Sequence, residues 1–148
     1  MFSKSCEYGI RSVVFIAIAS CKGRKVGVKE IAREIDSPEA FTGKILQTLV
    51  KHKIIMSFKG PSGGFFIPEE SLSRIKLVEI VSAMDGDAVF KNCPLGLSLC
   101  LGEMPCPVHN KFKSVRNELE EVLNSVSIAD LTKNINTKQA FLKRGITD

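Results

Sequence analysis

Residues 28–67 decide the fold, and they read VKEIAREIDSPEAFTGKILQTLVKHKIIMSFKGPSGGFFI. Apolar residues over 28–35 recur at the spacing of one helix face, and the same spacing returns over 37–53. Asp36 and Ser37 offer side-chain oxygens that can cap the second helix, and Pro38 suits its first turn. Two short helices joined by a tight polar turn predict a helix-turn-helix.

The end of the quoted stretch predicts a β-hairpin. Residues 54–58 and 65–67 are rich in β-branched and aromatic side chains, and Lys59-Gly60-Pro61-Ser62-Gly63-Gly64 lies between them. A hairpin that follows a helix-turn-helix is the order of a winged helix. We therefore expect a mainly α fold with a small β-hairpin wing.

Charge is concentrated in the same part of the chain. The 148 residues carry a net charge of +5. Residues 22–59 hold nine Lys or Arg against four acids, so the remainder of the chain sums to zero. A basic segment that contains a capped helix and a wing favours a polyanionic partner, double-stranded promoter DNA. The length excludes a large multidomain enzyme, and two histidines leave little for acid–base catalysis.

Further helices are expected on both sides of this module. Periodicity predicts a buried helix over 5–21, another over 75–84, and a long one over 111–126. The apolar stripe of the long helix has only residues 128–131 available to cover it, which favours a homodimer. We expect a DNA-binding domain at 1–90, a cysteine-rich loop at 91–110, a dimerisation helix region at 111–131 and a polar tail at 132–148.

The cysteine-rich loop holds the strongest chemical motif. From Cys93 to His109 it reads CPLGLSLCLGEMPCPVH, a C-x6-C-x5-C-x2-H spacing that includes Cys100 and Cys106. Thiolates suit iron–sulfur clusters or zinc, and this spacing is wider than the C-x2-C pairs usual in structural zinc sites. Unligated thiols that only pack remain a third possibility.

Cysteine number and hydropathy bear on the compartment. No run approaches the roughly 20 apolar residues that cross a bilayer, so we expect a soluble, cytoplasmic protein with no membrane partner. Five cysteines, an odd number, suit a reducing compartment better than a disulfide framework. We assign Cys6 and Cys21, on the first helix, to the core.

The chain resembles the Rrf2 family of bacterial iron–sulfur winged-helix regulators, over roughly residues 1–131. The motifs that carry the resemblance are EYGIR at 7–11, VKEIA at 28–32, ILQTL at 45–49, KGPSGGF at 59–65, and the three-cysteine loop. The family is typified by the cluster-assembly repressor and the nitric-oxide-sensing repressor. The resemblance implies a transcriptional regulator whose DNA binding is controlled by a cluster that senses nitric oxide, redox state or iron–sulfur status.

The resemblance also implies a ligand set. Cys93, Cys100 and Cys106 would hold a 2Fe-2S or 4Fe-4S cluster. Glu7, from the partner subunit, matches the fourth ligand of the nitric-oxide-sensing branch, and His109 matches that of the cluster-assembly branch; Glu7 is slightly favoured. A change at the cluster would order or release the loop and alter the separation of the two recognition helices.

The DNA contacts are expected on the helix over 37–53 and on the wing. Lys44 would contact a base or a phosphate, Ala40 and Thr42 would line the surface, and Gly43 would leave room for the duplex. Lys59 would reach the minor groove. The complete candidate set is Ser37, Ala40, Phe41, Thr42, Gly43, Lys44, Lys59, Gly60, Ser62, Gly63 and Gly64.

Two other functions share some of these features. A cluster-free repressor could use the three loop cysteines as oxidation-sensing thiols, and it would be colourless even when prepared without oxygen. An electron-transfer protein would also need cysteines, but it has no use for a basic helix and a wing. We expect no enzymatic activity.

Overall fold

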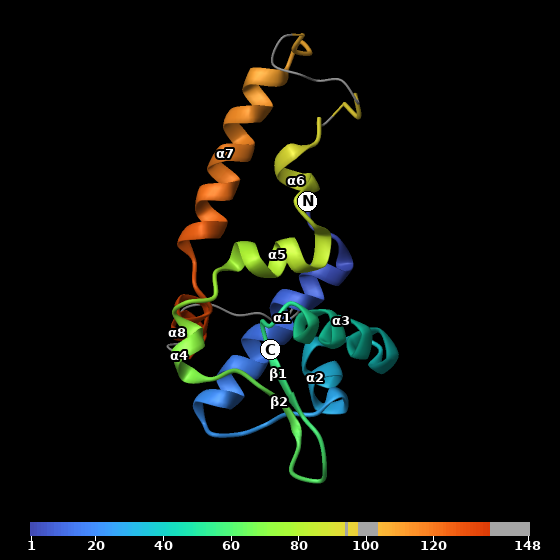
Figure 1. Cartoon of the computed structure of the whole chain (residues 1–148), viewed down its shortest axis with the longest axis vertical. Coiled ribbons are helices and arrows are strands. Elements are labelled where there is room, and N and C mark those ends of the chain that lie inside the picture. Colours follow the sequence, from blue (N-terminus) through green and yellow to red (C-terminus); the bar gives the residue numbers. More distant parts are fainter. Residues whose placement is uncertain (94, 98–103, 137–148) are drawn as a thin grey trace, which may run out of the picture.

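The computed structural model describes residues 1–93, 95–97 and 104–136 (Figure 1). Its elements in chain order are α1 (Lys4–Cys21), α2 (Val28–Ile35), α3 (Glu39–Lys51), β1 (Met56–Phe58), β2 (Gly64–Phe66), α4 (Glu69–Leu72), α5 (Leu77–Asp85), α6 (Ala88–Lys91), α7 (His109–Ser125) and α8 (Ile128–Asn136). The predicted fold class, mainly α with a β-hairpin, is confirmed.

Helix α1 lies at the centre of the core. Its side chains at Val13, Ile16 and Ala17 are fully buried, and α2, α3, α5, α8 and β2 all pack against it. Burying one Ile or Leu side chain contributes about 1.5–3 kcal/mol, so this helix organises the domain. Ser20 is buried as well; its hydroxyl donates to the Ile16 carbonyl at 2.7 Å and accepts from the Ile67 amide at 2.9 Å.

Helices α2 and α3 form the predicted helix-turn-helix, with one correction to its turn. Asp36 ends α2 in the left-handed conformation, at φ 55°, and neither Asp36 nor Ser37 caps α3 with its side chain. The N-cap position of α3 is Pro38, so the expected capping was wrong. Asp36 is instead the C-cap of the preceding helix, because Asp tolerates the left-handed region better than most residues. Helix α3 is also shorter than the predicted 37–53.

The wing is a small antiparallel sheet with a third segment beside it. Ser57 pairs with Phe65, and Phe58 pairs with Gly64. On the other side of β2, Val26 and Phe65 exchange two backbone hydrogen bonds, at 3.2 and 2.8 Å. Gly64 has φ 138°, and a Cβ there would lie 2.8 Å from the Val26 carbonyl oxygen. A side chain at position 64 would therefore separate the wing from the α1–α2 loop.

Helix α7 extends away from the helix-turn-helix, with α6 beside it (Figure 1). It packs on α5 and α6 through Leu119 and Leu123, next to Phe90 of α6. Residues 128–131, which we considered as a cover for the apolar stripe of α7, belong to α8, and α8 packs on α1. Helix α8 also extends through Asn136, into the segment that we expected to be a polar tail. Of that tail, residues 137–148 lie outside the described part.

The start of α8 has a reciprocal cap. The Ser127 amide donates to the Asp130 carboxylate at 2.9 Å, and the Asp130 amide donates to the Ser127 hydroxyl at 3.1 Å. These bonds satisfy free N–H groups at the helix start. No helix in the described ranges is long and apolar enough to span a bilayer.

Candidate functional site

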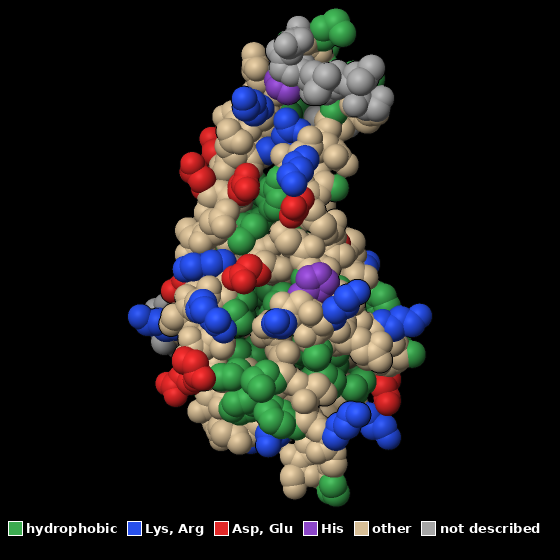
Figure 2. All heavy atoms as spheres, in the orientation of Figure 1, with side chains coloured by type: hydrophobic (Ala, Val, Ile, Leu, Met, Phe, Trp, Pro, Cys, Tyr) green, Lys and Arg blue, Asp and Glu red, His purple; other side chains and the backbone are tan. Residues whose placement is uncertain are grey.

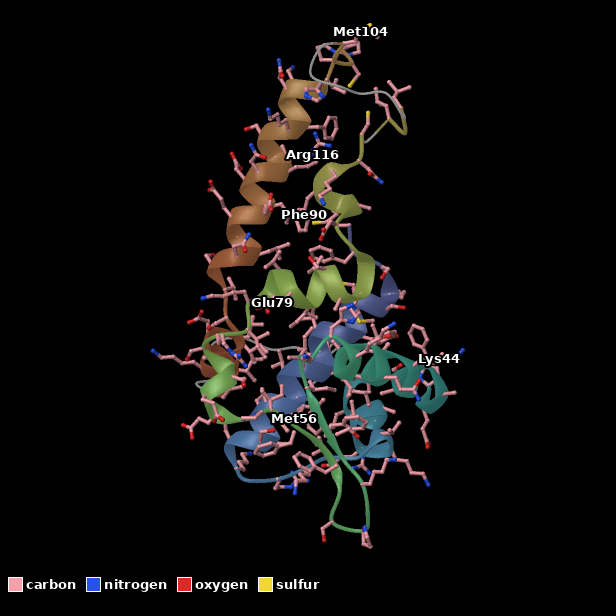
Figure 3. The ribbon with its side chains drawn as sticks, in the orientation of Figure 1. Lys44, Met56, Glu79, Phe90, Met104 and Arg116 are labelled. Carbon is pink, nitrogen blue, oxygen red and sulfur yellow. The ribbon has the colours of Figure 1, made fainter. Side chains whose placement is uncertain are left out.

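Helix α3 presents one solvent-facing strip. Ala40, Lys44 and Gln47 are exposed, and Gly43 lies among them at the spacing of one helix face. A Cβ built at Gly43 meets no heavy atom within 4 Å, so nothing inside the chain requires glycine there. Lys44, which Figure 3 labels, is the sixth residue of α3, and its side chain is exposed. The strip is therefore open to solvent and accessible to a partner.

Gln47 was not among the candidate DNA contacts. Its side chain is exposed and lies one turn beyond Lys44 on the same strip. The sequence feature that could have identified it is its spacing, three residues after Lys44 on the same helix face. A glutamine amide can donate a hydrogen bond to adenine and accept one from it at the same time.

One of the candidates on and just before this helix lies differently from expectation. Thr42 is fully buried, and its hydroxyl donates to the Pro38 carbonyl at 2.9 Å, so its expected place at the surface was wrong. Phe41 is half-buried, with its ring edge-on to Tyr8 at a centroid distance of 5.7 Å. Ser37 is half-buried in the turn. Internal partners account for Thr42 and Phe41.

The wing places the remaining DNA candidates. Lys59, Gly60 and Ser62 are exposed, whereas Gly63 and Gly64 are half-buried. Gly60 has φ 98° and its carbonyl accepts from the Gly63 amide at 2.9 Å, which closes the tip. Only glycine adopts such a φ without strain, so the tip sequence follows from its geometry.

Lys25 contacts the wing at the end of β1, next to the tip. Its ammonium lies 4.6 Å from the centroid of the Phe58 ring, a cation–π distance. Arg24 forms an ion pair with Glu30 at 2.8 Å. Figure 2 shows further Lys and Arg side chains over α2 and α3. Part of the positive charge predicted for residues 22–59 therefore lies on α2, α3 and the wing.

The cysteine loop connects α6 to α7. Cys93 follows α6 by two residues, and Cys106 precedes α7; both are half-buried. His109 is the first residue of α7, and its backbone N–H donates to the Cys106 carbonyl at 3.0 Å. Cys100 lies outside the described residues. Thiolate and imidazole groups are the donor types that iron–sulfur clusters accept.

Glu7 belongs to the first turn of α1, where Lys4 forms an ion pair with it at 3.3 Å. No three His, Cys, Asp or Glu side chains within residues 1–93, 95–97 and 104–136 are close enough to share a metal ion. Glu7 therefore does not group with Cys93 and Cys106 inside one chain.

The two cysteines of α1 differ. Cys6 is fully buried, as expected, and burial raises the pKa of its thiol to about 12, with Asp85 and Glu7 adding to the effect. Cys21 is exposed at the end of α1, so its assignment to the core was wrong. Cys21 is the last residue of its helix, next to the following loop, and at such a position the apolar spacing does not indicate whether a side chain is buried.

Helix α7 has an apolar strip that the rest of the described chain leaves uncovered. Phe112, Val115 and Val122 are 40%, 59% and 55% exposed. Leu123, on the other side of the helix, is 2% exposed. The uncovered strip lies beside the inner seam of α7 and faces solvent.

A helix-turn-helix with an exposed strip that carries Lys44, followed by a wing that carries Lys59, is the architecture of a winged-helix DNA-binding protein. The chain belongs to the Rrf2 family, described as iron-dependent transcriptional regulators, whose model matches residues 2–134. The family and the fold are those of transcriptional regulators and not of enzymes, as predicted.

Individual relatives agree with this assignment. One relative is a protein of Aquifex aeolicus (strain VF5) named as an HTH-type transcriptional regulator. It is 28% identical to this chain over 143 residues, and the match covers 95% of this chain and 96% of the relative. IscR of Sodalis glossinidius, also an HTH-type transcriptional regulator, is 25% identical over 128 residues, covering 86% and 76%.

Solved structures show the same fold. IscR of T. potens has a TM-score of 0.75 at 22% identity, covering 95% of this chain and 92% of its own. CymR, the global cysteine regulator of B. subtilis, has a TM-score of 0.73 at 19% identity, covering 90% and 96%.

Proposed function

We propose that this protein is a homodimeric regulator whose binding to promoter DNA is controlled by an iron–sulfur cluster on Cys93, Cys100 and Cys106. The observation that carries the proposal is the position of the cysteine loop. It leaves α6 at Cys93 and enters α7 just after Cys106, so it joins the DNA-binding module to the helix with the uncovered strip. The iron dependence in the family description supports iron as the metal.

The DNA step rests on α3 and the wing. Lys44 reads a guanine edge or a phosphate in the major groove, with Ala40 and Gly43 close to the base edges. Lys59 neutralises a phosphate near the minor groove, and Gly60, Ser62, Gly63 and Gly64 let the wing follow the backbone. Ser37, Phe41 and Thr42 act indirectly, through the turn and the core contacts that hold α3 in place.

The cluster step rests on the loop. The three thiolates would hold a 2Fe-2S or a 4Fe-4S cluster, and the fourth ligand would be His109 or Glu7 of the partner subunit. When bound, the cluster supplies a reactive iron centre that oxidants or nitric oxide can modify. The chain's own part is to hold the thiolates and to transmit the loop's order to α7.

The dimer rests on the exposed strip of α7. Phe112, Val115 and Val122 present an apolar strip that a second copy can cover in twofold symmetry. Two copies related in this way place two α3 helices for the two halves of a palindromic site. A change in the loop then alters their separation, because the loop ends at the first residue of α7.

The test starts from protein purified under nitrogen. We expect visible absorption with bound iron and sulfide, and we expect Cys100→Ser to abolish both. Cys21→Ser, which alters an exposed cysteine outside the loop, should leave both unchanged. A colourless, iron-free wild type would contradict the cluster step.

DNA binding is tested separately, by titration of promoter fragments at several salt concentrations. Lys59→Ala should weaken binding and reduce the salt slope by about one. Lys44→Ala should weaken binding by about 1–3 kcal/mol if Lys44 reads a base. Lys113→Ala removes an exposed charge from α7 and serves as the control. An unchanged affinity and salt slope in Lys59→Ala would contradict its assignment.

A second candidate is a thiol-based repressor without a cluster. Cys93 and Cys106 are half-buried and therefore within reach of an oxidant. This function predicts a colourless protein whose DNA affinity changes on oxidation and recovers with a thiol reductant. Cys93→Ser would remove the response.

A further inference from the structure

One hydrogen bond joins α7 to the start of the cysteine loop. The guanidinium of Arg116 donates to the backbone carbonyl of Asn92 at 2.6 Å, across 24 positions of sequence. Asn92 is the C-cap of α6 and directly precedes Cys93. Figure 3 shows Arg116 between α7 and α6. This contact fixes the point at which the loop leaves α6.

The position of Arg116 on α7 follows from the packing below it. Leu119 and Leu123 face α5 and α6, and Arg116 continues the same face by one step toward the start of the helix. The apolar seam between α6 and α7 therefore ends where the guanidinium begins. A carbonyl at the end of a helix lacks an intrahelical partner, and an arginine is well suited to supply one.

The same face of α7 leads to the other end of the loop. His109 lies seven residues before Arg116, which is about two helical turns, or roughly 10 Å along the axis. The His109 amide holds the Cys106 carbonyl at 3.0 Å. Helix α7 thus binds the backbone next to Cys93 through Arg116 and the backbone of Cys106 through His109.

We propose that Arg116 is a positioning residue that holds Cys93 against α7, so that Cys93 and Cys106 are oriented toward a common ligand before that ligand binds. The inference rests on the proposed cluster function for its purpose. The contact itself does not depend on a metal, because both partners belong to the protein. Without the guanidinium, Cys93 would have to be ordered at the moment of cluster binding.

The chain provides a matched pair of variants. Arg116→Ala removes the donor. Asn92→Ala leaves the accepting carbonyl in place, because the bond is made to the backbone. Arg116→Lys keeps a positive donor of different shape and tests rescue, and Lys113→Ala removes a neighbouring positive charge from α7.

The first readout uses metal-free, reduced protein. We expect Arg116→Ala to raise the alkylation rate of Cys93, followed by peptide mass spectrometry, and the amide exchange of residues 92–97 by about three- to ten-fold. Arg116→Lys should fall between this variant and the wild type. Asn92→Ala and Lys113→Ala should match the wild type. The far-ultraviolet circular dichroism should be the same in all of them.

The second readout uses protein purified under nitrogen. The visible absorption of Arg116→Ala should decay about three- to ten-fold faster after dilution than that of Asn92→Ala. Wild-type rates in Arg116→Ala for both readouts would overturn the inference. If the wild type held no cluster, the proposed function would fail, and the metal-free readout would still decide the role of Arg116.

Discussion

The carboxylate of Asp85, the last residue of α5, accepts hydrogen bonds from both the backbone amide and the hydroxyl of Ser3. The amide contact measures 2.9 Å. Ser3 is the N-cap of α1, and its hydroxyl also accepts from the Cys6 amide at 3.0 Å. The end of α5 therefore holds the first turn of α1, the turn that contains Glu7.

Asp85→Ala should lower the free energy of unfolding by about 1–2 kcal/mol, because it removes two hydrogen bonds and loosens a helix cap. Urea denaturation followed by circular dichroism measures the change. Glu118→Ala, an exposed carboxylate on α7, is the control. A double-mutant cycle with Ser3→Ala should give a coupling energy above about 0.5 kcal/mol. Additive effects would show that the two residues act separately.

Gly43→Ala should stabilise the free protein by about 1 kcal/mol, because alanine favours helix and no atom lies within 4 Å of the added Cβ. The same change should weaken binding to promoter DNA, because the added methyl group would occupy the strip that we propose to face the groove. Thermal unfolding and fluorescence anisotropy measure the two effects. A variant that is more stable and binds DNA as well as the wild type would remove Gly43 from the interface.

Gly9→Ala is the matched control for that experiment, since it also replaces a glycine inside a helix. A Cβ at Gly9 would lie 3.0 Å from Cγ of Met84. Met84 must move to make room, which offsets the gain in helix propensity. We therefore expect a smaller gain in stability than at Gly43. Equal gains would indicate that the Met84 contact carries no cost.

The buried thiol of Cys6 should make folding sensitive to alkaline pH. Its pKa rises from 9.0 to about 12, chiefly through burial. Between these values the unfolded chain loses the proton and the folded chain keeps it, so stability falls as pH rises. Between about pH 9 and about pH 11, the wild type should lose up to about 1.4 kcal/mol per pH unit more than Cys6→Ala. Urea denaturation at several pH values measures the free energy of unfolding of both proteins. If the two free energies changed equally with pH across that range, the raised pKa of Cys6 would be contradicted.

Val115→Asp should dissociate the proposed dimer. Val115 is 59% exposed in the single chain, and a second copy would bury it. A carboxylate in that position would weaken association by about 3 kcal/mol, or about a hundred-fold in Kd. Sedimentation velocity measures the change. Asn117→Asp adds the same charge to another exposed position of α7, and its mass in solution should remain that of the wild type.

Periodicity predicted the DNA-binding module well because its helices are amphipathic and its wing is local. Helix α2 begins at Val28 and ends at Ile35, as the spacing indicates. The role of a polar side chain was harder to predict where more than one hydrogen-bond partner was available to it. Asp36 could have served either neighbouring helix. Thr42 has a polar side chain, yet it is buried because its hydroxyl bonds to the carbonyl of Pro38 within the same turn.

The candidate site divides in the same way. The spacing of Cys93, Cys100 and Cys106 indicates a ligand set without any structure, because thiolates so close together favour a common centre. The Arg116–Asn92 contact joins two elements far apart in the sequence, and only the fold brings them together. The start of α8 had a local signal in Ser127 and Asp130, and that signal was missed.

The wing and the cysteine-bearing end of α7 lie at opposite poles of the molecule, and Figure 3 labels Met56 toward one pole and Met104 at the other. Under the proposed function, a duplex bound at the wing lies at the pole opposite Cys93 and Cys106. Under the same proposal, a small oxidant would reach the cysteines while the protein is bound to its promoter. The proposed response would then not require the protein to dissociate first, and its rate would depend on the chemistry at the cysteines and not on the residence time on DNA.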